Sequence, residues 1–168
     1  ISFELDLFTT LQAHHDEDAD YAQRKGRSNG VRVWAVGQAM ALERALSLYS
    51  KPGIGTEGQF PEFYFFDCHS CHRRIFDDQR FSQTVADNPG RPIPVGMPPF
   101  NDENMIMLSA TARVAAPALA ARFDADSKAF HAAIARDRGG AVAAAGRLQT
   151  SASALSVAFQ ATGFDRAQ

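Results

Sequence analysis

Phe65-Phe66-Asp67-Cys68-His69-Ser70-Cys71-His72-Arg73-Arg74 holds both cysteines of the 168-residue chain and two of its five histidines. Within this stretch, two cysteines are separated by two residues, and His72 follows the second cysteine directly. This spacing is the pattern for covalent attachment of a c-type haem. Two thiols three positions apart can add across the two vinyl groups of one porphyrin, and the next residue then falls under the iron. The sequence therefore predicts one haem c, with Cys68 and Cys71 as thioether attachment points and His72 as the proximal axial ligand.

Three other uses of a close cysteine pair remain as alternatives. A closed structural zinc site needs four ligands, usually with a second cysteine pair, and this chain has only two cysteines. A dithiol redox motif is expected beside a strand-helix-strand pattern, which the sequence does not show. A disulfide between cysteines this close would close a very short loop and stabilise the fold little. Covalent haem is therefore the leading interpretation.

On the residues from Cys68 to His72, the chain resembles a monohaem c-type cytochrome. A second likeness lies at Gly96-Met97-Pro98-Pro99-Phe100, which is similar to the methionine loop of class I cytochromes c, where a Met followed by Pro supplies the second axial ligand. The two likenesses cover roughly residues 65 to 115. The resemblance implies an electron-transfer protein with a six-coordinate haem. It also implies a periplasmic location, because in bacteria the haem ligation machinery works outside the cytoplasmic membrane.

The second axial ligand has several candidates in the sequence. The segment from 87 to 100 is rich in proline and stiff, so it can hold the Met97 thioether in place with little conformational entropy left to lose. His15 and His14 are the alternatives, since both lie near the apolar stripe of a first predicted helix, and either would give bis-histidine coordination with a lower reduction potential. An open sixth position would instead indicate a five-coordinate haem enzyme or gas-binding sensor, with His14, His15 or Arg91 above the iron.

The residues flanking the motif have the character of a haem pocket. Phe65 and Phe66 end an aromatic segment that can form an apolar wall on the haem, and exclusion of water there raises the reduction potential. Arg73 and Arg74 are candidates for charge-assisted hydrogen bonds to the haem propionates. We expect the aromatic segment and the proline-rich segment to hold the haem between them.

Composition limits the class of protein. With 17 basic and 19 acidic residues the formal net charge is −2, which does not indicate a nucleic-acid binder. The longest apolar runs are much shorter than the ~20 residues that a membrane span needs. We therefore expect redox partner proteins, which dock briefly around an exposed haem edge. The chain begins at Ile1 without a leader, so we expect a processed or truncated chain, and one domain of a multihaem redox protein stays an alternative.

The length fits a single haem domain over residues 1–168, with an N-terminal helical part (1–58), a haem-binding part (59–115) and C-terminal packing helices (116–168). Hydrophobic periodicity predicts an all-α fold of about five helices around one covalently bound haem, with long loops rich in glycine and proline. The first two predicted helices cover residues 4–25 and residues 31–50, the second with a cap at Ser28 or Asn29. A third helical segment begins at Asn101 or Asp102 and is divided near Ala116 by Pro117. The last two predicted helices cover residues 125–137, with a cap at Asp124 and an end at Gly139-Gly140, and residues 141–161. His131 falls off the apolar stripe of its segment and is predicted to lie on the surface.

Overall fold

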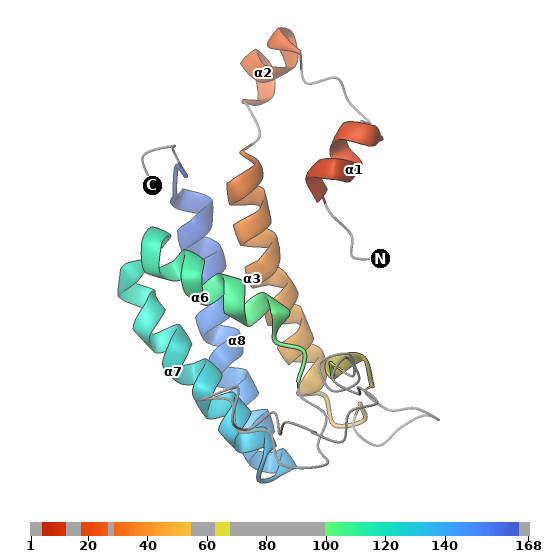
Figure 1. Ribbon diagram of the computed structural model, residues 1–168, viewed down its shortest axis with the longest axis vertical. Coiled ribbons are helices and arrows are strands. Elements are labelled where there is room, and N and C mark those ends of the chain that lie inside the picture. The colour runs from red at the N-terminus through yellow and green to blue at the C-terminus, as the bar shows by residue number, and fades with distance from the viewer. Residues whose placement is uncertain (1–4, 13–17, 27–28, 55–62, 68–99, 165–168) are drawn as a thin grey trace, which may run out of the picture.

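The computed structural model describes residues 5–12, 18–26, 29–54, 63–67 and 100–164. Over these residues the protein is all-α, as predicted (Figure 1). An antiparallel bridge between Phe66 and Phe100 is the one β-type pairing that they contain. The helical elements are α1 (Leu5–Leu11), α2 (Ala19–Lys25), α3 (Gly30–Tyr49), the 3-10 helix η1 (Phe63–Phe65), α6 (Glu103–Ala115), α7 (Pro117–Ile134) and α8 (Arg138–Ala161).

Four helices form a bundle with one continuous hydrophobic core. Helix α8 packs against α3 on one side and α7 on the other, and α6 packs against α7 and α3 (Figure 1). The apolar residues of each helix recur at three- and four-residue steps, which is the spacing of a single helical face. Burial of each large side chain contributes roughly 1.5–3 kcal/mol relative to leaving it in water. The largest fully buried side chains are Phe123, Phe130, Phe159, Leu42, Leu46, Leu108, Leu148 and Leu155.

Helix α3 begins at a side chain that also holds the far end of the chain. Asn29 Oδ1 accepts a hydrogen bond from the backbone N–H of Arg32 at 3.0 Å, which confirms one of the two predicted caps. Asn29 Nδ2 donates to the carbonyl oxygens of Gly163 at 3.0 Å and Phe164 at 3.3 Å. Asn29 therefore joins the start of α3 to the segment that follows α8.

The predicted division at Pro117 is confirmed, but the helix boundaries that follow it were wrong. Pro117 lies in the first turn of α7, where its missing N–H costs nothing, so α7 starts seven residues before Asp124 and runs unbroken through that residue. Asp124 is therefore not a cap. Gly139 and Gly140 do not end a helix either, because Asp137 Oδ1 accepts from the N–H of Gly140 at 2.7 Å and caps the first turn of α8 around both glycines.

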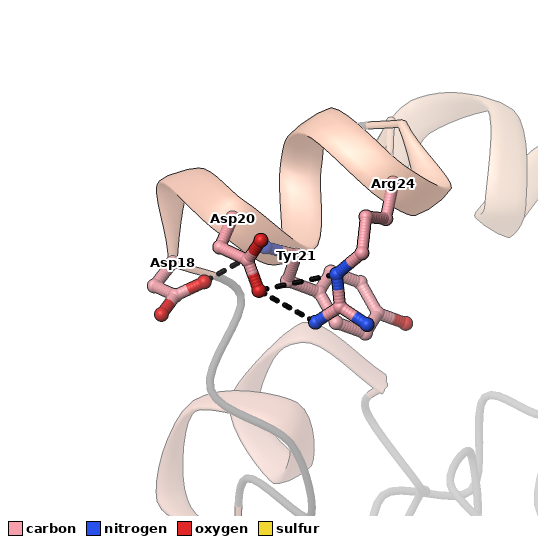
Figure 2. A network of polar contacts seen from close by, with 4 residues as sticks. All are labelled: Asp18, Asp20, Tyr21 and Arg24. Carbon is pink, nitrogen blue, oxygen red and sulfur yellow. Dashed lines mark hydrogen bonds and ion pairs between the residues drawn. The ribbon is translucent and has the colours of Figure 1, made fainter.

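The single helix predicted over residues 4–25 was also wrong in extent. Helix α1 ends at Leu11 and α2 begins after Asp18, whose Oδ1 accepts from the N–H of Tyr21 at 2.8 Å (Figure 2). Short acidic side chains favour helix caps over helix interiors, because they compete for nearby backbone N–H groups. Helix α2 buries no residue, and its Asp20–Arg24 ion pair at 2.7 Å is about two-thirds exposed. Helices α1 and α2 lie apart from the bundle (Figure 1).

Replacing Asn29 by Ala removes a helix cap and the two bonds to the C-terminal segment. We expect the free energy of unfolding to fall by about 1–2 kcal/mol in denaturant titrations followed by circular dichroism. Asp18→Ala is the matched control: it removes a cap of the same type from α2, which has no buried residues. We expect that control to stay within about 0.5 kcal/mol of wild type. Equal losses in the two variants would contradict the role assigned to Asn29.

Candidate functional site

Two segments of the chain meet at one end of the bundle. Phe66 pairs with Phe100 in the antiparallel bridge, and the N–H of Asn101 donates to the carbonyl oxygen of Phe65 at 2.8 Å. The chain therefore leaves this end of the bundle at Asp67 and returns to it at Phe100. The cysteine motif begins at the residue after Asp67. The predicted haem attachment site therefore follows directly in sequence on a residue at this end of the bundle.

A cluster of four buried aromatic rings, from Tyr49, Phe65, Phe100 and Phe130, holds the two segments in place. The Tyr49 ring meets the other three in edge-to-face contacts, with centroids 5.6 Å from Phe65, 6.0 Å from Phe100 and 5.6 Å from Phe130. Phe100 also meets Phe130 edge-to-face at 4.9 Å. Such pairs contribute about 0.5–1.5 kcal/mol each beyond the burial of their area. The cluster therefore anchors both ends of the segment from 68 to 99 to α3 and α7.

Arg138, the first residue of α8, covers this cluster. Its Nη2 donates to the carbonyl oxygen of Tyr49 at 2.9 Å, and its guanidinium carbon lies 4.7 Å from the centroid of the Tyr49 ring. The hydrogen bond satisfies a carbonyl in the last turn of α3, and the position over the ring is that of a cation–π contact. Arg138 thus joins α8 to the end of α3 beside the point where the chain leaves the bundle.

A groove of about 440 Å³ runs between α6 and α7. It begins at Asp102, two residues after Phe100, so one end of the groove lies beside the bridge. Its volume is within the range of about 300–1,000 Å³ that is usual for ligand sites. The lining residues are Asp102, Met105, Ile106, Ser109, Ala110, Arg113, Asp124, Ser127, Lys128 and His131.

The end of the groove beside the bridge holds a buried histidine and carboxylate. His131 Nε2 lies 3.5 Å from Asp102 Oδ2, and each residue is only 8% exposed. The prediction of a surface position for His131 was therefore wrong. On α7, the residues Ala120, Asp124, Ser127 and His131 follow one another at three- and four-residue steps and so share one face of the helix. Helix α6 and Asp102 before it cover this face, which the apolar stripe of Phe130 and Ile134 alone did not indicate.

The other end of the groove is closed by polar contacts between α6 and α7. Asp124 Oδ1 accepts from Ser109 Oγ at 2.6 Å, and its Oδ2 accepts from Arg113 Nη2 at 2.9 Å. Burial by itself raises the pKa of Asp124. The hydrogen bonds from Ser109 and Arg113, with the positive charges of Arg113 and Lys128, outweigh that effect and hold the pKa below its ordinary 3.8. Asp124 is therefore ionised near neutral pH in the folded protein.

The structure describes two of the predicted site residues. Phe65 is buried in the aromatic cluster, and Phe66 is half-buried and forms the bridge. Within the described part of the chain, no group of three or more His, Cys, Asp or Glu side chains could hold a metal ion. The remaining candidates lie outside the described residues: Cys68, Cys71, His72, Arg73, Arg74, Arg91, Met97, His14 and His15.

Two further findings bear on function. No protein-family model, curated protein or solved structure matches this chain. Among the described helices, none is long and apolar enough to cross a membrane. The features of the chain that bear on function are therefore the cysteine motif and the bundle end at Asp67, which directly precedes that motif.

Asp124→Asn removes a carboxylate whose pKa is lowered on folding. Such a group stabilises the fold at pH values above its unfolded pKa, and this stability is lost as the pH falls through the lower folded pKa. We expect the variant to lose about 1 kcal/mol of unfolding free energy near neutral pH. The loss should shrink at pH values well below 3.8, where wild-type Asp124 is itself protonated.

The matched control is Asp20→Asn, because Asp20 forms an ion pair of similar length at an exposed position. Little change is expected there at any pH. A stability loss in Asp124→Asn that stays constant down to the acid limit of folding would show that ionisation of Asp124 does not contribute.

Proposed function

We propose that this protein is an electron-transfer c-type cytochrome that carries one haem, bound covalently through Cys68 and Cys71, with His72 as the proximal ligand. The observation that carries the proposal is the spacing of these three residues, which is the pattern of covalent haem attachment. Its position supports the proposal, because the motif starts one residue beyond a bundle end held by the Phe66–Phe100 bridge.

The residues around this bundle end fit an amphipathic macrocycle. Phe66 is half-buried there, and Ile106 in the adjoining groove exposes 56% of its surface. The same groove carries Lys128, whose charge suits the carboxylates of a haem, while Arg113 there is paired with Asp124. Arg73 and Arg74 next to the motif are further candidates for that role. These groups would orient a haem and limit its contact with water, which are two of the ways in which a protein adjusts such a cofactor.

The proposed activity is single-electron transfer between redox partner proteins. A haem iron supplies the one-electron chemistry when it is bound. If protein side chains fill both axial positions, iron changes oxidation state with little rearrangement and has no vacant position for a substrate, which describes a carrier rather than an enzyme. Met97, His15 and His14 are the sequence candidates for the second position. A periplasmic location belongs to the same proposal.

An intact mass of the matured protein tests the covalent attachment. We expect the mass to exceed the 18.3 kDa polypeptide by one haem and the excess to survive denaturation, because thioether bonds do not depend on the fold. Cys68→Ser with Cys71→Ser should remove the excess. Ser70→Ala, which changes a residue between the two cysteines and leaves both thiols, should keep it. A colourless matured protein with free thiols, or with zinc on them, would overturn the proposal.

The spin state of the iron tests whether the haem protein is an electron carrier. We expect optical spectra of a six-coordinate, low-spin iron in both oxidation states, because a carrier keeps both axial ligands. The ferrous protein should bind carbon monoxide slowly or not at all. A high-spin ferrous iron that binds carbon monoxide readily would show a vacant position. It would favour a five-coordinate haem enzyme or gas-binding sensor.

A further inference from the structure

We propose that the outer face of α3 binds a second copy of this chain, with the two α3 helices packed antiparallel about the level of Gly37. The outer face lies on the side of α3 opposite its buried residues. The inference goes beyond the proposed function and is independent of it, because it uses no residue of the cysteine motif and no property of a haem.

The outer face of α3 is apolar although it is exposed to solvent. Val33, Gly37 and Met40 follow one another at three- and four-residue steps and so share this face. Val33 is 40% exposed and Met40 is 49% exposed. With Val36 they line a groove of about 830 Å³, to which α8 contributes Gln160. Exposed apolar surface gathered in one place often marks a protein interaction site, because a partner removes that surface from water.

Gly37 provides the room that a second helix needs. Glycine inside a helix is destabilising relative to alanine, so its presence there calls for a reason. A Cβ atom at Gly37 would meet no atom within 4 Å, so no contact in the described part of the chain requires glycine at this position. The missing side chain lets the backbone of another helix approach closely. We therefore place the crossing point of the two α3 helices at Gly37.

Two opposite charges on α3 lie at nearly equal distances from this crossing point. Arg32 is five residues before Gly37, and Glu43 is six residues after it. Eleven residues advance a helix by about 16.5 Å and rotate it by about 20° beyond three full turns, so Arg32 and Glu43 lie on the same flank of the helix. Among the described residues neither forms an ion pair, and Glu43 accepts one long hydrogen bond, at 3.4 Å, from Gln149 Nε2.

This arrangement of charges is self-complementary in an antiparallel pair. A two-fold axis perpendicular to the helices at the level of Gly37 brings Arg32 of one copy to the level of Glu43 of the other, on the same flank. The contact occurs twice, once at each end of the apolar face. A parallel pair would instead place like charges at the same level. Charge complementarity therefore favours a second copy of this chain, in the antiparallel orientation, as the occupant of the outer face.

Sedimentation equilibrium of the whole 168-residue chain tests the inference, at concentrations from about 1 μM to about 1 mM. We expect wild type to approach twice the mass of the single chain as the concentration rises. Gly37→Leu should weaken the dimer by about tenfold or more, because its side chain fills the crossing point but extends into open space in the single chain. Gly146→Leu is the matched control: Gly146 is an exposed glycine of α8 with equally open surroundings, and the variant should keep the wild-type dissociation constant.

Charge reversals test the antiparallel orientation. Arg32→Glu and Glu43→Arg each replace two attractive pairs by two repulsive ones, so each should weaken the dimer by about three- to tenfold. The double variant restores opposite charges at both ends and should recover the wild-type dissociation constant. Arg147→Glu is the matched control, because it reverses a charge of α8 that is exposed and does not line the groove, and little change is expected there.

Three results would overturn the inference. A wild type that stays monomeric over the whole range would show that the outer face does not bind a second copy and is open to another occupant, such as a different protein. A dimer that tolerates Gly37→Leu or the single charge reversals would use another surface. A double reversal that fails to restore the affinity would exclude the antiparallel orientation. If circular dichroism shows that Gly37→Leu does not fold, the charge reversals still decide. None of these results bears on haem attachment, which the intact mass reports separately.

Discussion

The pairing of Phe66 with Phe100 is the constraint on which the arrangement of the candidate site depends. It brings together the two ends of a 32-residue segment, from 68 to 99, that holds the cysteine motif and Met97. Closing a loop of that length costs on the order of 3 kcal/mol plus a constant. The edge-to-face contacts of Tyr49 with its aromatic neighbours, and the hydrogen bond from Asn101 to Phe65, offset this cost. That anchorage fixes Asp67 and Phe100, the residues on either side of the segment, at one end of the bundle.

Local chemistry explains which parts of the fold can be predicted from the sequence. The all-α class, the cap at Asn29 and the division at Pro117 follow from periodicity and from residues whose backbone preferences act over one helical turn. The errors arose where one local signal overrode another. Asp137 caps α8 strongly enough to keep Gly139 and Gly140 inside its first turn, although glycine pairs usually end helices. Asp124 has the character of a cap in sequence, but it serves instead as the acceptor for Ser109 and Arg113 of α6.

The candidate site also has a part that can be predicted from the sequence and a part that cannot. Cys68, Cys71 and His72 can be recognised from sequence because their chemistry depends on adjacent positions. The groove cannot, because it exists only when α6 and α7 lie side by side and brings Asp102 to His131. Ser127 and His131 are four residues apart and share a face wherever the helix begins. The sequence of α7 alone does not show that α6 covers this face, so the burial of His131 against Asp102 could not be predicted from it.

A crystal structure of the haem-loaded ferric protein, with anomalous data collected at the iron absorption edge, tests the account most directly. The account predicts one iron peak, with porphyrin density continuous to the sulfur atoms of Cys68 and Cys71 and the imidazole of His72 on the iron. Free sulfur atoms without iron would contradict the proposed function.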